Sequence, residues 1–543
     1  MGFLLCMTAM MEVYISIMNR KPGLPQRSSI IFWLALAMIA LAGVALLWYT
    51  TPHGLALVND SVNYIDGARN MLAGHGYSRI LGNGNYAPVT NFPPFYSMVL
   101  AGFLLAGLDG ITATWWVSIL FFAFNLVLIG WLGRKVTGSG LFGVLTSFLF
   151  LLNESFLNFH TFALSEPVFI FTFFLCLVFL VKYLEKPVWY WIALSGLFAS
   201  LAYLTRYIGI ALFVTAIAAL VIFLPGLKRK LKSVLFFLAG AMPAVAAWTV
   251  RNILQTGSAT NRQSMWHVIP GEAIQEGVLS FWSWLLPERY NLIERFIGFW
   301  QFLLFLLLII ALAAVIILSL RFWLLKTKPG LKIQFTWVIV IQAAAYLVLL
   351  VFTIAYLDAS VNFEDRILMP IYNMLLLLIV AGLYWLWTRK KWLFKAAAVF
   401  ITLALMLSFV EDTMDTIKLN RSQGQGFANE YWTESQTMAE LARHPDLLVY
   451  TNRPRAVNLF LDRGAYILPS RLNPSTGLPW TDYEKTVSTI RQRVLDGKAL
   501  LVVFDYESAT SDEEGQALMQ DLTEGLPLLV EYSDGIIFGY AQK

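Results

Sequence analysis

Long apolar runs separated by short polar stretches dominate the chain up to about residue 410. A helix needs about 20 residues to cross the roughly 30 Å of hydrocarbon in a bilayer, and about eleven runs approach that length. They are residues 30–49, 113–133, 140–157, 166–184, 188–204, 207–224, 233–250, 297–320, 334–356, 367–387 and 393–410. The pattern therefore predicts an α-helical polytopic membrane protein with about eleven spans.

A shorter apolar run, PFYSMVLAGFLLAGL from Pro94, decides the orientation of all later segments. As a helix it would reach only about 22 Å. If it does not cross, the lysines between the spans fall on the same face as Lys21, and the opposite loops hold arginines but no lysine. Cytoplasmic loops carry an excess of positive residues. We therefore predict a juxtamembrane helix in the first outer loop and an extracytoplasmic C-terminus.

Composition supports a membrane protein, because 58% of the residues are hydrophobic, 13% are charged and the mean hydropathy is +0.65. Soluble domains carry about a quarter charged residues. Membrane orientation explains the net charge of +5, so we predict membrane lipid and no nucleic acid as a partner. Cys6 lies near the start and Cys176 inside an apolar run, which excludes a disulfide or a cysteine metal cluster within the loops and tail.

The first residues make a poor signal peptide. They carry Glu12, lack a basic beginning and have no small-residue cleavage site. Met18, which opens MNRKPGLPQRSS, is a candidate for the true start. We assign residues 1–29 to a cytoplasmic N-terminal segment.

Residues 30–410 form the predicted transmembrane domain, and the composition changes abruptly after them. Residues 411–543 alternate β-branched runs with helix-like stretches, and a hairpin signal, SDG, begins at residue 533. This predicts a small C-terminal α/β domain. An odd number of spans that starts from a cytoplasmic N-terminus would place this domain on the extracytoplasmic side. The stretch that begins at Arg421 is the expected linker.

The first outer loop presents a carboxylate, Asp60, just after a predicted span. Apolar residues recur at helical spacing from Val58, so the segment can lie flat with Asp60 and Tyr64 one turn apart on another face. Catalysis by Asp60 and substrate binding by Tyr64 are one interpretation. The alternative is a structural N-cap, with Asn59 or Asp60 opening an interfacial helix.

The next outer turn, LLNESFLNFHTFALSEPVF, holds Glu154, His160 and Glu166. Glu166 and Glu154 are further catalytic candidates. Ser165 followed by Glu166 and Pro167 is also a typical helix start, in which an acid complements the helix dipole. A metal site from the three side chains is less favoured, because their spacing matches no compact ligand motif.

Arginines mark the outer ends of several spans. Arg206, Arg251 and Arg366 each lie where a span meets the outer face. They can snorkel to the interface, but lysine would serve that purpose equally and is absent from these loops. Because guanidinium groups grip phosphate with a planar fork, the three are candidate phosphate ligands. Arg262 and His267, in the long outer loop, are candidate substrate-binding residues.

An ordered series of motifs resembles a known family. DSVNYIDGARNMLAGHGYS, FPPFYSMVLAGFLL, LSEPVF, YLTRY, WTVRN, DRILMPIY and VYTNRPRAVNLFL follow one another from Asp60 to about Leu461. They are similar to the bacterial GT-C glycosyltransferases related to protein O-mannosyltransferases and the lipid A aminoarabinose transferase. The resemblance implies a polyprenyl-phosphate sugar donor, an active site on the extracytoplasmic face of the plasma (inner) membrane, and a catalytic role for Asp60.

Two departures from the family pattern affect the expected chemistry. Asn59 and Asp60 stand where many relatives have two acids, so a divalent metal cofactor is left open. Ile367 replaces the aromatic residue that often follows the arginine of DRILMP.

The expected enzyme is a hexosyl or pentosyl transferase for an extracytoplasmic acceptor, which can be a lipid, a glycan or a protein. Two alternatives belong to other functional classes. A transporter would carry ionisable residues near the middle of its spans, and here the spans are almost free of charge. A non-catalytic envelope-assembly protein would need no crowding of Asp60, Glu154, Glu166 and the arginines on one face.

Overall fold

The computed structural model describes residues 27–260, 266, 268–286, 292–306, 330–356, 363–471 and 480–540. The expected start at Met18 and nearly all of the expected cytoplasmic segment lie outside these residues, as do Arg262 and His267.

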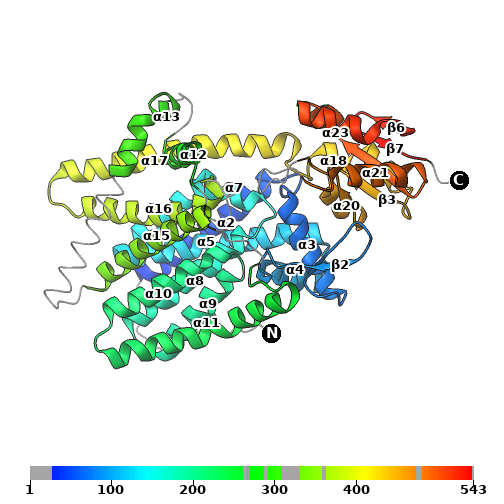
Figure 1. Ribbon diagram of the computed structural model, residues 1–543. Helices are drawn as coiled ribbons and strands as arrows, with labels where there is room; N and C mark the ends of the chain where they lie inside the picture. The colour runs from blue at the N-terminus through cyan, green and yellow to red at the C-terminus, as the bar shows by residue number, and fades with distance from the viewer. Residues whose placement is uncertain are drawn as a thin grey trace.

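A bundle of long apolar helices forms most of the molecule (Figure 1). Within the described ranges, seven helices are long and apolar enough to cross a membrane. They are α2 (Arg27–Thr50), α5 (Gly110–Thr137), α8 (Glu166–Glu185), α11 (Leu227–Thr256), α15 (Leu331–Tyr356), α16 (Asp365–Trp387) and α17 (Trp392–Gln423). An eighth span results if α6 (Gly140–Leu152) and α7 (Glu154–Thr161), which meet at 58°, are counted together. The prediction of a polytopic helical membrane protein is confirmed.

The expected number of about eleven spans is not confirmed. The runs at 188–204 and 207–224 are interrupted and short, since they form α9 (Trp189–Tyr203), the 3-10 turn η1 (Tyr207–Gly209) and α10 (Ile210–Phe223). A helix with the 15 residues of α9 rises only about 22 Å. The run at 297–320 is described only as far as Leu306. Two shorter helices, α12 (Gly271–Ser283) and α13 (Leu292–Arg295), precede it.

Helix α8 forms the centre of the bundle. In its most apolar stretch 89% of the residues are buried, and its neighbours include α5, α9, α10 and α15. A helix that is apolar on all sides can lie in the core of a large protein or span a membrane, and the burial of α8 shows that other helices surround it. The N-terminal end of α8 is therefore a fixed point, around which the other functional segments are arranged.

One end of the bundle, which we call the α3 end, carries a compact segment between α2 and α5. It contains α3 (Asn59–Leu72), an antiparallel hairpin of β1 (Ser78–Ile80) and β2 (Tyr86–Pro88), and α4 (Phe95–Leu105). With 11 residues, α4 reaches about 16 Å, too little to cross a membrane, and it packs against α3 and α5.

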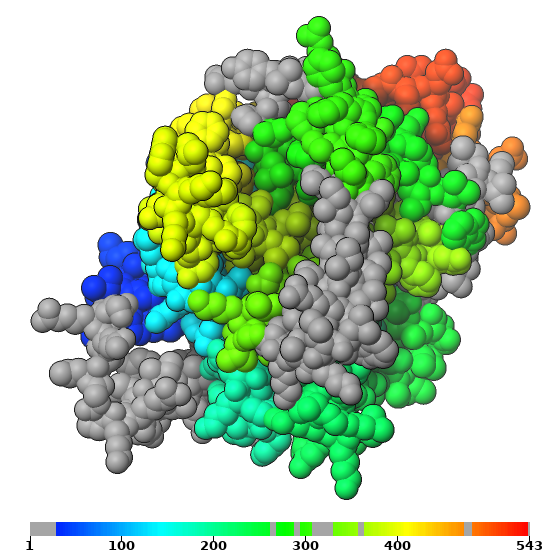
Figure 2. All heavy atoms as spheres, turned by 90° about the vertical axis from the view of Figure 1, so that its left-hand side faces the viewer, coloured from blue at the N-terminus to red at the C-terminus, as the bar shows by residue number. Residues whose placement is uncertain are grey.

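The opposite end of the bundle faces the viewer in Figure 2. We call it the lysine end, because lysines from several turns lie there. Lys135 pairs with Glu185 at 2.7 Å, and the ammonium group of Lys182 lies 4.5 Å from the centre of the Trp191 ring. Lys332 lies over the ring of Tyr384, at 5.5 Å. Turns that are far apart in sequence thus share one face, as the charge pattern predicted.

A small mixed α/β unit follows α17, which confirms the expected C-terminal domain. The predicted boundary at residue 410 falls inside α17. The unit contains α18 (Glu430–Thr433), α19 (Gln436–Leu441), β3 (Leu448–Thr451), α20 (Pro454–Leu461), β4 (Tyr466–Ile467), α21 (Tyr483–Leu495), β5 (Ala499–Phe504), α22 (Tyr506–Ala509), α23 (Glu513–Thr523), β6 (Leu528–Tyr532) and β7 (Gly535–Phe538). The strand order is β4-β3-β5-β7-β6, with β3 parallel to β4 and β5, and β7 antiparallel to β5 and β6.

The C-terminal unit lies against the α3 end (Figure 1). The backbone N–H of Phe427 donates to the carbonyl oxygen of Leu57 at 2.7 Å. Arg69 on α3 pairs with Asp462, just after α20, at 3.4 Å. The domain and the segment that carries Asp60 therefore share one face of the molecule.

Candidate active site

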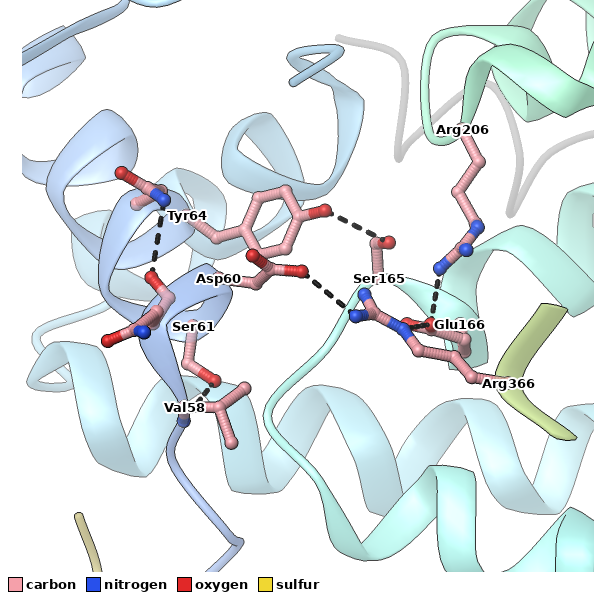
Figure 3. A network of polar contacts seen from close by, with 10 residues as sticks. Val58, Asp60, Ser61, Tyr64, Ser165, Glu166, Arg206 and Arg366 are labelled. Carbon is pink, nitrogen blue, oxygen red and sulfur yellow. Dashed lines mark hydrogen bonds and ion pairs between the residues drawn. The ribbon is translucent and has the colours of Figure 1, made fainter. Parts of the chain in front are cut away.

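Asp60 lies in the first turn of α3 but does not cap it. Val58 occupies the N-cap position in an extended conformation, and its backbone N–H donates to the hydroxyl of Ser61 at 3.0 Å. The carboxylate of Asp60 instead accepts a hydrogen bond from Nη1 of Arg366, at 3.0 Å from Oδ2 (Figure 3). The side chain of Asp60 is 28% exposed. The structure thus favours the site interpretation of Asp60 over the cap interpretation.

Glu166 begins α8, and its side chain is only 1% exposed. Its Oε1 atom accepts hydrogen bonds from Nη1 of Arg206 and from Nε of Arg366 (Figure 3). Its Oε2 atom has no hydrogen-bond partner among the described residues. A buried carboxylate is tolerated when cations compensate its charge, so Glu166 and the two arginines form one electrostatic unit.

Arg366 bridges the two acids. It lies in the first turn of α16, where it can reach both the α3 segment and the start of α8. Arg206 comes from the break between α9 and η1, where its extended backbone turns the chain. The two acidic neighbours of Arg366, Glu364 and Asp365, precede it directly in the sequence. Its ion pairs instead join segments that lie far apart in the chain.

Tyr64 is buried beneath this cluster. Its hydroxyl lies 3.3 Å from Oγ of Ser165, and its ring makes edge contacts with Phe92 and Tyr96. Burial raises the pKa of Tyr64 to about 12, and the charge of Asp60 acts in the same direction. With 3% exposure, Tyr64 fixes α3 against the start of α8 and presents almost no surface to a substrate.

Glu154 and His160 do not join the cluster. Oε1 of Glu154 accepts a hydrogen bond from Thr416 at 2.8 Å, which ties α7 to α17. His160 is fully buried, and its Nδ1 atom lies 2.7 Å from the carbonyl oxygen of Phe156. No three His, Cys, Asp or Glu side chains in the described part of the chain are grouped to hold a metal ion.

The side chain of Arg251 binds backbone carbonyl groups. Its guanidinium donates to the carbonyl oxygens of Val89 and Tyr77, the latter at 2.7 Å, and lies 5.0 Å from the ring centre of Trp248. These contacts fasten the β1–β2 hairpin to α11. The guanidinium group of Arg251 is therefore engaged by backbone carbonyls and does not join the Glu166 cluster.

The site also includes a residue to which no role was given from the sequence. Arg455 on α20 interacts electrostatically with Asp60 and Asp66, while burial lowers its pKa. Arg455 belongs to VYTNRPRAVNLFL, the last of the motifs that resemble the family. What the motif alone could not indicate is that the C-terminal unit folds back onto α3.

Part of the chain that contributes to the site matches a model of a known protein family. Residues 57–267 match the model described as dolichyl-phosphate-mannose-protein mannosyltransferase. This segment contains Asp60, Glu166 and Arg206. No curated protein matches the chain in a sequence search.

Solved structures show the same fold. ArnT from Cupriavidus metallidurans in the apo state is 14% identical, with a TM-score of 0.52 over 95% of this chain and 100% of that one. The complex of ArnT with undecaprenyl phosphate is 14% identical, with a TM-score of 0.51. That match covers 93% of this chain and 99% of the ArnT chain. The archaeal oligosaccharyltransferase AglB from Archaeoglobus fulgidus, in complex with an inhibitory peptide and a dolichol-phosphate, is 11% identical, with a TM-score of 0.53. That match covers 93% of this chain and 74% of the AglB chain.

These matches confirm the resemblance indicated by the ordered motifs. The chain is a multi-pass membrane protein that shares the fold of ArnT and AglB, and its residues 57–267 match the dolichyl-phosphate-mannose-protein mannosyltransferase family.

Proposed function

We propose that the protein transfers a sugar from a polyprenyl-phosphate-linked donor to a hydroxyl group of an extracytoplasmic acceptor. The observation that carries this proposal is the bridge from Asp60 through Arg366 to Glu166, with Arg206 on the same carboxylate. The bridge puts an accessible carboxylate and two guanidinium groups at one end of the bundle. The lipid phosphates in the ArnT and AglB complexes support a donor of this class.

In the proposed reaction Asp60 acts as the general base. It takes the proton of the acceptor hydroxyl while the acceptor oxygen forms a bond to the anomeric carbon of the sugar. The bond from that carbon to the phosphate oxygen breaks, and its electron pair leaves with the polyprenyl phosphate. The leaving group gains one negative charge, which Arg366 and Arg206 stabilise through N–H groups that do not face Glu166.

Glu166 is a positioning residue in this proposal. Its single oxygen Oε1 orients both guanidinium groups before the donor arrives. Preorganised cations stabilise developing charge without the cost of reorganisation during the reaction. Because Oε1 of Glu166 is already shared by two arginines, we assign the proton transfer to the more exposed Asp60.

We further propose that the α3 end faces the extracytoplasmic side of the plasma membrane. The gathering of lysines at the opposite end supports this orientation, because cytoplasmic loops are enriched in positive residues.

The test is turnover of undecaprenyl-phosphate-linked sugars by the purified protein, measured as release of undecaprenyl phosphate. Asp60→Asn should lower the rate by about 10²- to 10⁴-fold, the usual contribution of a general base. Asp415→Asn is a matched control, because Asp415 forms an exposed pair with Lys418 on α17. Normal turnover by Asp60→Asn would exclude Asp60 as the base.

A further inference from the structure

A cavity of about 320 Å³ lies between the start of α3 and the C-terminal unit. Asn59, the residue before Asp60, lines it on the α3 side. Phe427, Tyr431 and Trp432 line it from the connection after α17, and Arg453 and Asp505 line it from the sheet. Small-molecule sites have volumes of about 300–1,000 Å³, so the cavity is large enough for a small ligand.

The two charged residues follow adjacent parallel strands. Arg453 comes just after β3 and Asp505 just after β5. Ligands of open α/β sheets bind at the carboxyl ends of the strands, and both residues project from such ends. Asn452 connects the two positions, because its amide exchanges hydrogen bonds of 2.7 and 3.0 Å with the backbone of Phe504. Arg453 and Asp505 are therefore held side by side.

Both charges are available to a ligand. Neither the guanidinium group of Arg453 nor the carboxylate of Asp505 makes a hydrogen bond or ion pair with another described residue. Asp505 also has a left-handed backbone, with φ of 50°, which is unusual for a residue other than glycine. Such conformations persist where the surrounding structure imposes them, and they cluster at ligand sites.

A network of hydrogen bonds imposes that conformation. The backbone N–H of Asp505 donates to the carbonyl oxygen of Asp534 at 3.0 Å. The buried carboxylate of Asp534 accepts hydrogen bonds from Ser435 and Thr437, the latter at 2.8 Å from its hydroxyl. The turn that carries Asp505 is thus fixed before any ligand binds.

Aromatic side chains complete the cavity. The ring of Trp432 packs against Phe427, Tyr431 and Phe504, with centroids 5.0–5.3 Å apart. Tyr431 and Trp432 are both half-buried. Their rings offer an apolar surface beside the guanidinium and carboxylate groups. A sugar ring has the matching chemistry, since it combines apolar C–H faces with hydroxyls that donate to a carboxylate and accept from a guanidinium.

We propose that this cavity binds one sugar residue of a carbohydrate acceptor. Arg453 and Asp505 bind its hydroxyls, and Tyr431 and Trp432 pack against its ring. This assignment rests on the proposed function, because it makes the cavity the acceptor side of the Asp60 site. It favours a glycan over a lipid chain, which would need a longer apolar groove.

The test is saturation-transfer NMR on the full-length protein in nanodiscs, with chitotriose, maltotriose and methyl α-mannoside as probes and a serine- and threonine-containing peptide as the alternative ligand. We expect millimolar binding of at least one carbohydrate. Arg453→Gln and Asp505→Asn should each weaken it at least about tenfold, as expected for loss of a charged hydrogen bond. Asparagine tolerates the left-handed backbone, so Asp505→Asn should preserve the turn.

Two exposed residues at the start of β5 supply matched controls. Lys498 and Asp496 form a pair at 3.1 Å outside the cavity, so Lys498→Gln and Asp496→Asn should bind the carbohydrate normally. Absence of carbohydrate binding, or equal binding by the cavity variants, would overturn the inference. Binding of the peptide alone, weakened by the same variants, would also overturn it and identify a peptide site.

The outcome is separable from that of the proposed function. If Asp60→Asn loses turnover while no carbohydrate binds, only the cavity assignment fails. If a carbohydrate binds through Arg453 and Asp505 while Asp60→Asn turns over normally, the catalytic proposal fails.

Discussion

Arg366 and Asp60, which are 306 residues apart in the chain, are joined by an ion pair of 3.0 Å between Nη1 and Oδ2. The same guanidinium donates through Nε to Glu166. One side chain of α16 thereby sets the position of an accessible acid on α3 relative to a buried acid on α8.

Replacing either arginine by lysine should impair use of the donor. Lysine keeps the charge but loses the planar fork that Arg366 uses to bridge two carboxylates. We expect kcat/KM for the polyprenyl-phosphate sugar to fall at least about tenfold in Arg366→Lys and in Arg206→Lys. Arg491→Lys, in an exposed pair with Glu524, is the control. Normal kinetics in both variants would place the donor phosphate elsewhere.

Glu166→Gln should destabilise the protein, because it leaves two guanidinium groups facing a neutral amide at a buried position. Removing one partner of a buried ion pair costs about 3–5 kcal/mol. The double variant Glu166→Gln/Arg206→Gln restores the balance of charge and should have a higher Tm than Glu166→Gln alone. Thermal unfolding of both variants in the same detergent is the measurement. Equal Tm values would show that Arg206 and Glu166 are not coupled.

Asp66 should make stability depend on pH. It is 3% exposed on α3, and burial raises its pKa to about 6 from an ordinary value of 3.8, although Arg69 and Arg455 oppose the shift. Between these two values the folded protein binds more protons than the unfolded chain, so stability falls as the pH rises. The full loss, of the order of 3 kcal/mol, is reached above about pH 6.

The measurement for Asp66 is Tm between pH 4 and pH 7. Asp66→Asn cannot ionise, so its Tm should fall less over this range than that of the unmodified protein, whereas Asp415→Asn should follow the unmodified protein. Parallel curves for Asp66→Asn and the unmodified protein would mean that Asp66 has an ordinary pKa.

Sidedness can be tested with single cysteines in a background lacking Cys6. Asn83, between β1 and β2, and Ser488, on α21, are both exposed at the α3 end or in the C-terminal unit, and Lys390 is exposed at the lysine end. In intact spheroplasts an impermeant maleimide should label Asn83→Cys and Ser488→Cys but not Lys390→Cys. Labelling of Lys390→Cys alone would reverse the proposed orientation.

Much of this protein followed from local patterns in the sequence. Apolar runs of span length identify membrane helices because hydrocarbon requires every backbone polar group to be bonded within the segment. Lysine placement separated the two ends of the bundle, and the alternation after residue 410 identified the small α/β unit, including the β6–β7 hairpin at the SDG signal. Each of these depends on residues close together in the chain.

The structure brings together several candidate residues whose charges compensate one another. Glu166 is a candidate because it is an acid in an outer turn, and Arg206 and Arg366 are candidates because arginine, with no lysine in the outer loops, suits phosphate binding. The structure joins these three to Asp60. Glu154 and Arg251 carried the same local signal, but the fold gives them Thr416 and backbone carbonyls as partners. Periodicity does not reveal which partner a side chain meets.

Only the tertiary structure decided how distant segments combine. It paired Arg366 with Asp60, placed Arg455 near that acid, and brought Asn59 to the cavity that Arg453 and Asp505 line. These contacts depend on the C-terminal unit folding back against α3, through hydrogen bonds such as that from Phe427 to Leu57. Hydrophobic patterning determines which elements form and which faces they bury, whereas the pairing of polar groups at their ends follows from packing of the whole chain, because such pairs have no sequence period.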